Sequence, residues 1–415
     1  MKRSTRTHRM RGLSLIEILV ALAIGSLLVL GLVDVFAASR TAYQLSTGLA
    51  RVQENGRFAM DFLQRDLRMA GHLGCVNDQA RFLPTNAGLR PPLASTFLAT
   101  AGDYGSVVHP ALAFDVAIRG HEATGTGPGN ALALATTPTP AASADAWSPA
   151  INATIFADMV GAAGSAGAPV AGSDVVELRL FLPNGAQMTA FDPATGTLSY
   201  DAAQAPRLTD GAENPGLFGI ADCMNAAVFQ ATTRSATAIT VQAGGLNQAA
   251  LTGSEAFVAG QARIHRAESV VYYVGLNNSG MPALYRLRYA ATPAGALVPE
   301  REELVEGIES MQFKYGQDSR TDPAETPTGN IGSSRLAHEV LPAADPVSAW
   351  RRVGMVQVGL LARSTEPAAA TQRATDVEGV TALSALGLRL NPPNDTYYRA
   401  VYEDTIAVRN RLFGN

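Results

Sequence analysis

The chain has 415 residues, and its 36 acidic side chains outnumber its 32 basic ones, which gives a formal net charge of −4. This balance argues against a nucleic-acid-binding protein that depends on phosphate contacts. Because 47% of the residues are hydrophobic and only 16% are charged, the composition also excludes a highly charged disordered chain.

The N-terminal segment combines a basic cluster with a long apolar run. The cluster consists of Lys2, Arg3, Arg6, Arg9 and Arg11. Because the apolar run of residues 13–38 follows directly, the positive-inside rule explains the cluster better than a nucleic-acid arm does. As a helix the run would be about 39 Å long, more than the bilayer core of about 30 Å. The sequence predicts a single transmembrane helix over 13–38, surrounded by membrane lipid.

An acidic residue, Glu17, interrupts the start of this run. An unpaired carboxylate in hydrocarbon costs at least about 2.5 to 3.5 kcal/mol on insertion scales, so it needs a polar edge or a positive partner. One interpretation places Glu17 at the headgroup edge, about one helical turn from the membrane surface. The residues around it favour a second interpretation.

The junction from Arg11 to Glu17 reads Arg-Gly-Leu-Ser-Leu-Ile-Glu. It resembles the processing site of type IV prepilins, in which a basic leader ends in Gly and Glu is the fifth mature residue. The resemblance implies that residues 1–12 are a leader, that prepilin peptidase cuts between Gly12 and Leu13, and that the new Leu13 amine is methylated. Leu13 departs from the Phe or Met that is more usual there.

Cleavage at this position would remove the basic cluster and create a cationic amine at the start of an apolar helix. That amine on one subunit and Glu17 on its neighbour would neutralise each other inside a helical bundle. The rival interpretation is a secretory signal peptide that is cut before Ala38. It leaves both Glu17 and Asp34 unexplained.

The helical pattern continues beyond the apolar run, over residues 39–70. Apolar or small residues recur at steps of three and four, which is typical of an amphipathic helix; they are Leu45, Leu49, Val52, Gly56, Ala59, Leu63, Leu67 and Ala70. We therefore expect one helix over 13–70, about 87 Å long, whose second half packs on its own globular domain. The alternative is a coiled-coil stalk, against which Gly48 and Gly56 count.

Residues 71–415 form the remaining, β-rich part of the prediction. Alternating or continuous apolar runs predict strands at 176–180, 270–276, 285–289, 311–315, 353–361 and 405–408. Between residues 120 and 173 the sequence is rich in Ala, Gly, Thr, Ser and Pro, so we expect an elaborated loop region. The predicted fold class is α+β, with a long N-terminal helix packed on a β-rich globular domain.

The two cysteines, Cys75 and Cys223, both follow the predicted membrane segment, on the exported side. In the periplasm such a pair is most simply a disulfide, which would tie the end of the long helix to the β-rich body. The alternative is two buried thiols.

Several downstream motifs resemble PilW-type minor pilins of type IV pili. They are Gly71-His72-Leu73-Gly74-Cys75, Asp222-Cys223 before Phe229, Leu284-Tyr285-Arg286, Leu304 to Glu309 leading into Tyr315 to Asp318, Trp350 with Leu360 to Ser364, and Arg409-Asn410. The resemblance implies a pilin-like fold, an inner-membrane helix with a periplasmic domain, and later a place in the pilus. The implied partners are prepilin peptidase, other minor pilins, the major pilin and the inner-membrane assembly platform.

A search for reactive chemistry gives little. The six histidines have no zinc-ligand spacing, and the chain contains no nucleophile elbow, Walker A loop or Cys-x-x-Cys, so we expect no enzyme and no cofactor. The one metal candidate is a weak calcium site at Asp318, Asp322 and Glu325, for which a solvated acidic loop is the other interpretation.

These observations predict a PilW-like minor pilin that primes pilus assembly, sits at the pilus tip and supports twitching motility, adhesion or DNA uptake. The same N-terminus fits a second candidate, a large J-like pseudopilin of type II secretion. A candidate of another class is a surface-anchored adhesin that exposes residues 120–173.

Overall fold

The structure is a computed structural model of the chain. It describes residues 14–76, 84–85, 88–89, 93–99, 106–162, 164–223, 225–251, 257–322, 325, 327–343, 345–368, 383–408 and 410. The predicted cleavage junction, Gly12 and Leu13, lies outside the described residues.

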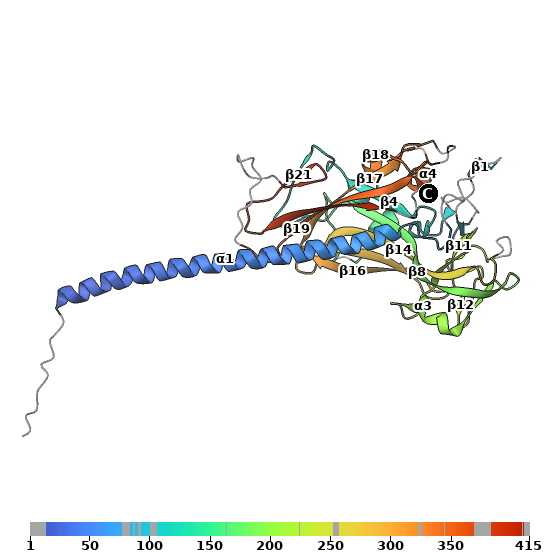
Figure 1. The fold of residues 1–415 in the computed structure, drawn as a ribbon, viewed down its shortest axis with the longest axis horizontal. Helices are drawn as coiled ribbons and strands as arrows, with labels where there is room; N and C mark the ends of the chain where they lie inside the picture. Colours follow the sequence, from blue (N-terminus) through green and yellow to red (C-terminus); the bar gives the residue numbers. More distant parts are fainter. Residues whose placement is uncertain are drawn as a thin grey trace, which may run out of the picture.

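The first element is one continuous helix, α1 (Leu15–Met69), of 55 residues, which projects far beyond the rest of the molecule (Figure 1). Its first buried residue is Gly48, so we name residues 15–47 the bare segment and residues 48–69 the docked segment. The predicted buried stripe is confirmed from Val52 onward, whereas Leu45 is 39% exposed. The stripe is therefore buried only from Val52 onward, about two helical turns after Leu45, where the apolar pattern begins.

The β-rich body is confirmed, and most of its strands belong to one large sheet. Among the described residues this sheet has 13 strands. The central path is β12 (Thr233–Arg234), β13 (Ala238–Thr240), β9 (Thr197–Tyr200), β8 (Val175–Asp192), β14 (Arg263–Leu276), β10 (Leu217–Ala221), β11 (Ala226–Gln230) and β3 (Ala94–Ser95). The branches are β15 (Pro282–Ala290) with β16 (Val298–Glu306), β4 (Ile118–Ala123) with β6 (Trp147–Ser148), and β7 (Ala168–Pro169).

Smaller sheets and helices complete the described body. The four-stranded sheet has the order β18 (Ile331–Arg335), β17 (Ile308–Asp318), β19 (Val353–Arg363) and β22 (Arg399–Ala407), and it is antiparallel throughout. The other elements are β20 (Ser384–Ala385), β21 (Leu388–Asn391) and β5 (Ala131–Ala133) in one sheet, β1 (Pro84–Thr85) with β2 (Gly88–Leu89), and the short helices α2 (Ala153–Val160), α3 (Ala205–Thr209) and α4 (Pro346–Arg351). Each of the six predicted strand segments overlaps one of the observed strands.

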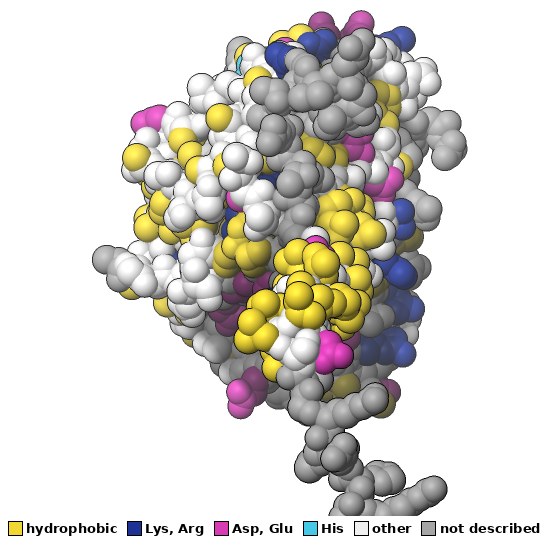
Figure 2. Space-filling view, turned by 90° about the vertical axis from the view of Figure 1, so that its left-hand side faces the viewer, with side chains coloured by type: hydrophobic (Ala, Val, Ile, Leu, Met, Phe, Trp, Pro, Cys, Tyr) yellow, Lys and Arg dark blue, Asp and Glu magenta, His cyan; other side chains and the backbone are white. Residues whose placement is uncertain are grey.

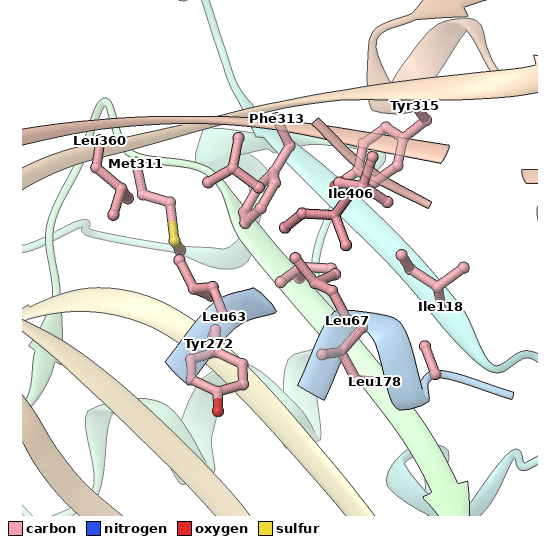
Figure 3. Packing of buried hydrophobic residues seen from close by; sticks show 14 of the residues in the cluster. Leu63, Leu67, Ile118, Leu178, Tyr272, Met311, Phe313, Tyr315, Leu360 and Ile406 are labelled. Atoms are coloured by element: carbon pink, nitrogen blue, oxygen red, sulfur yellow. The ribbon is translucent and has the colours of Figure 1, made fainter. Parts of the chain in front are cut away.

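The docked segment of α1 lies between the large sheet and the four-stranded sheet, as the close-up shows (Figure 3). Leu63 and Leu67 are fully buried there. On one side they meet apolar side chains of β17 and β19, including Met311, and on the other side those of β8 and β14. Burying each leucine stabilises the fold by about 1.5 to 3 kcal/mol, so this double contact attaches the helix to the body.

Polar contacts fix the register of the docked segment. The Tyr272 hydroxyl donates a hydrogen bond to Asp66 Oδ2 at 2.5 Å, and Arg286 Nη1 lies 3.6 Å from the same oxygen. Burial and the nearby Asp66 carboxylate raise the pKa of Tyr272 well above its usual value, so the hydroxyl stays a donor. Asn55 Nδ2 donates to the Glu306 carbonyl oxygen at 2.9 Å. A shift of one residue would break each of these contacts.

Residues 120–173 differ from the predicted loop region. The described part of this segment contains most of β4, then β5, β6, α2 and β7. Trp147, Ile151, Ile155 and Met159 are buried against side chains of β14 and β15. The sequence pattern is weak because small residues dominate, yet a few large side chains are enough to anchor the segment.

Two glycines of α1 allow the close approach of the body. A Cβ atom at Gly56 would lie 2.3 Å from the ring of Tyr402, and one at Gly48 would lie 2.4 Å from Ala368 Cβ. Both glycines are therefore contact positions of the docked segment, which explains why the helix tolerates them despite their low helix propensity.

We predict that Gly56→Ala destabilises the body by about 1 to 3 kcal/mol, because the strain of overpacking outweighs the gain in helix propensity. The measurement is denaturant unfolding of the full chain in detergent. Gly31→Ala is the matched control, since a Cβ atom there would meet nothing within 4 Å. A Gly56→Ala protein as stable as the wild type would contradict the prediction.

Candidate functional site

The described helix begins with a capping box at the predicted assembly residue. Ser14 is the N-cap of α1, and its Oγ accepts the backbone N–H of Glu17 at 3.2 Å, while Glu17 Oε2 accepts the backbone N–H of Ser14 at 2.9 Å. The carboxylate also lies at the positive end of the helix macrodipole. A single subunit thus gives the Glu17 charge a local partner. Its pairing with a neighbour's amine, and the cleavage between Gly12 and Leu13, stay predictions.

The bare segment presents a continuous apolar surface. Leu15, Leu28 and Leu32 are 79%, 70% and 71% exposed, and Figure 2 shows a group of hydrophobic side chains gathered where the helix points toward the viewer. By length and composition α1 could cross a membrane, with a mean hydropathy of 2.6 in its most apolar window. A surface of this size needs an apolar cover, either lipid or other helices.

The turn after α1 is tied to the large sheet by the predicted disulfide. Cys75 and Cys223 are bonded, with an S–S distance of 2.01 Å and Cα atoms 4.7 Å apart. Gly71 and Gly74 have φ values of 72° and 73°, a region that other residues rarely adopt, so they let the chain leave the helix and turn back toward β8. The alternative of two thiols is therefore wrong, and the Gly-x-x-Gly-Cys motif has a structural role.

Two histidines flank β8 beside this turn, and the sequence pattern predicts no role for either of them. His72 Nδ1 lies 2.7 Å from the Phe181 carbonyl oxygen, and His265 Nδ1 lies 2.8 Å from that of Leu182. The two rings are 5.9 Å apart and nearly perpendicular. His265 is 3% exposed, and its Nε2 has no hydrogen-bond partner among the described residues. Burial lowers the pKa of His265 to about 4.

A buried ionic cluster joins three strands of the four-stranded sheet. Glu309 on β17 accepts hydrogen bonds from Arg363 on β19 at 2.9 Å and from Arg399 on β22 at 2.7 Å. Arg399 also binds both carboxylate oxygens of Asp395, at 2.7 and 2.8 Å. Because buried charges are costly unless they are paired, removing one partner would be strongly destabilising. Glu309 and Arg363 belong to two of the sequence motifs, but nothing in the sequence pattern predicts that they pair.

The calcium candidate lies in a loop that already contains an internal cation. The guanidinium of the buried Arg352 donates to the carbonyl oxygens of Arg320, Asp322 and Glu325 at 2.6 to 2.9 Å. The Asp318 carboxylate accepts backbone N–H groups of the same loop. In the described part of the chain, no group of three or more His, Cys, Asp or Glu side chains could hold a metal ion. Calcium binding stays a prediction, and an ion would have to compete with Arg352.

We predict that the body loses stability as the pH falls from 6.5 to 4. The unfolded chain protonates His265 near pH 6.5, whereas the folded chain does so only near pH 4. Protons therefore favour unfolding in this window, by up to about 3 kcal/mol. The measurement is denaturant unfolding of the full chain in detergent from pH 7 to 4. His265→Gln should flatten this dependence, and an unchanged slope in the variant would contradict the assignment.

The comparisons with known proteins match both ends of the chain. Residues 7–33 match the model of the prokaryotic N-terminal methylation motif, and residues 271–410 match the model of the type IV pilus-assembly protein W family. No curated protein matches the chain.

A type IV-like pilin from Thermus thermophilus is similar among the solved structures. It is 15% identical over 39% of this chain and 74% of its own, with a TM-score of 0.20, values too low to support a conclusion. Both family matches fall on observed elements. The methylation motif covers the start of α1, and the second match covers the last part of β14, from residue 271, and all of β15 to β22. The chain is therefore similar to type IV pilus-assembly protein W over residues 271–410 and carries the N-terminal methylation motif at residues 7–33.

Proposed function

We propose that the protein is a minor pilin that is stored in the inner membrane through the bare segment, with its body in the periplasm. Prepilin peptidase would remove residues 1–12, and the mature subunit would then leave the membrane for the pilus. The observation that carries the proposal is the division of α1. Residues 15–47 contact almost nothing in their own chain, whereas residues 48–69 are buried between two sheets.

This division suits a subunit that exchanges one apolar environment for another. The bare segment can pass from lipid to a bundle of pilin helices without any change in its own fold, because both surroundings cover the same side chains. Its partners in the bundle would be other minor pilins and the major pilin, and the assembly platform would extract it from the membrane. We place the protein at the pilus tip, where a minor pilin would prime assembly and contribute to motility, adhesion or DNA uptake.

The type IV pilus is favoured over a type II secretion system by the match of residues 271–410 to the pilus-assembly protein W family. The methylation motif alone would fit both systems. An adhesin that exposes residues 120–173 finds less support, because the largest side chains of this segment are buried against the sheet. We therefore propose no second function.

The test is the Glu17→Ala variant in a piliated cell. Processing and the amount in the membrane should be unchanged, while the amount in sheared pili should fall about tenfold or more, since the neighbour's amine would lose its partner. Quantitative immunoblots of membranes and sheared pili measure both fractions.

Two controls separate charge pairing from helix capping. Ser14→Ala breaks the capping box but keeps the carboxylate, so it should retain most of the incorporation. Glu54→Ala removes an exposed acid from the docked segment and should behave like the wild type. Normal incorporation of the Glu17→Ala protein would argue against the proposed role.

A further inference from the structure

The bare segment contains a second carboxylate, Asp34, that the function described above does not use. Its neighbours in the helix are apolar and exposed: Val33 is 55%, Val35 is 70% and Phe36 is 71% exposed. Asp34 itself is exposed, and no described residue of the chain forms an ion pair or a hydrogen bond with its side chain. Asp34 is therefore a charged residue without a partner among the described residues of its own chain, on a helix surface that is otherwise apolar.

The position of Asp34 is compatible with storage in the membrane. It lies 19 residues after Leu15, the first residue of α1, which corresponds to about 28 Å along the helix, and the hydrocarbon core is about 30 Å thick. When the start of α1 is at the cytoplasmic face, Asp34 reaches the outer headgroups and water. Its charge therefore costs little until the subunit enters a bundle of helices, where apolar side chains would replace the water.

The nearest basic residue along α1, Arg40, does not serve as the partner within the same helix. Arg40 lies six positions further on, which places it about 9 Å higher and about 120° around the helix axis. Side chains with this spacing do not face each other, unlike those three or four positions apart. Arg40 is also exposed, and no described residue forms an ion pair with it.

We propose that Asp34 is a second assembly contact, at which its carboxylate pairs with an Arg or Lys side chain of an adjoining pilin helix that runs parallel to α1. This inference rests on the proposed function. Consider a parallel neighbouring helix that has a cation at the position equivalent to Arg40. If this neighbour is displaced by about 9 Å along the axis, its cation lies level with Asp34. A second copy of this chain has that pattern, and so would any pilin with a cation just beyond its apolar run.

The contact is distinct from the one at Glu17. Asp34 follows Glu17 by 17 residues, which turns the two side chains about 100° apart on the helix. They would therefore face different neighbours in a bundle. Two such contacts at opposite ends of the bare segment would fix both the height and the rotation of the subunit, whereas one contact would fix neither fully.

The experiment compares Asp34→Asn with wild type in piliated cells. Asn keeps the shape but not the charge, so a neighbour's cation would remain buried without a partner. We expect unchanged processing and membrane levels, and about a tenfold or greater fall in the amount in sheared pili. Asp61→Asn is the matched control, because it makes the same chemical change on the docked segment. There Asp61 is exposed, and its Oδ2 lies 3.9 Å from Nε of the exposed Arg57.

A cross-linking arm identifies the partner. A photoreactive benzoylphenylalanine in place of Leu30 lies one turn below Asp34 on the same face of the helix, and Leu30 is 59% exposed. In sheared pili it should attach to another pilin within about two turns of an Arg or Lys. A cross-link to this chain's own body, or equal incorporation of Asp34→Asn and wild type, would overturn the inference. If the wild type itself is absent from pili, the proposed function fails as well.

Discussion

The double burial of one helix segment is the constraint on which the rest of the structure depends. Residues 48–69 of α1 fill the space between the large sheet and the four-stranded sheet, so the two sheets share one core with the helix. The glycine at position 56 lets β22 come close, and the Asp66 carboxylate, which Tyr272 and Arg286 bind, sets the register. Without this segment, the apolar faces of both sheets would be open to water.

The docked segment also determines how the bare segment is held. Its end is tied to the large sheet by the bond between Cys75 and Cys223 and by the backbone turn at Gly71 to Cys75. The direction in which the bare segment leaves the body is therefore set by the fold. In a bundle of pilin helices, the packing of the bare segment would then determine where the body lies on the filament surface. We propose that the carboxylates at positions 17 and 34 specify that packing.

The sequence predicts the local features of this fold well and the long-range contacts poorly. The long helix, the six main strands and the disulfide can be predicted because hydrophobic periodicity indicates helices and strands, and a membrane segment before both cysteines indicates an exported, oxidising location. The exposure of Leu45 was not predicted, because periodicity does not show at which residue the contact between the helix and the body begins. The pairing of Glu309 with Arg363 and Arg399, the buried ring of His265 and the Arg352 guanidinium in the loop were also missed. Each of these depends on residues far apart in the sequence.

The processing of the N-terminus is the point at which the account can be tested most directly. The measurement is the intact mass, with fragmentation of the N-terminal peptide, of the protein isolated from membranes. We predict a mature chain that begins at Leu13 and carries a methyl group on its amine. A chain that still begins at Met1 would leave Glu17 without its partner amine, and a chain cut before Ala38 would lack Glu17 itself. Either result would contradict the pilin role.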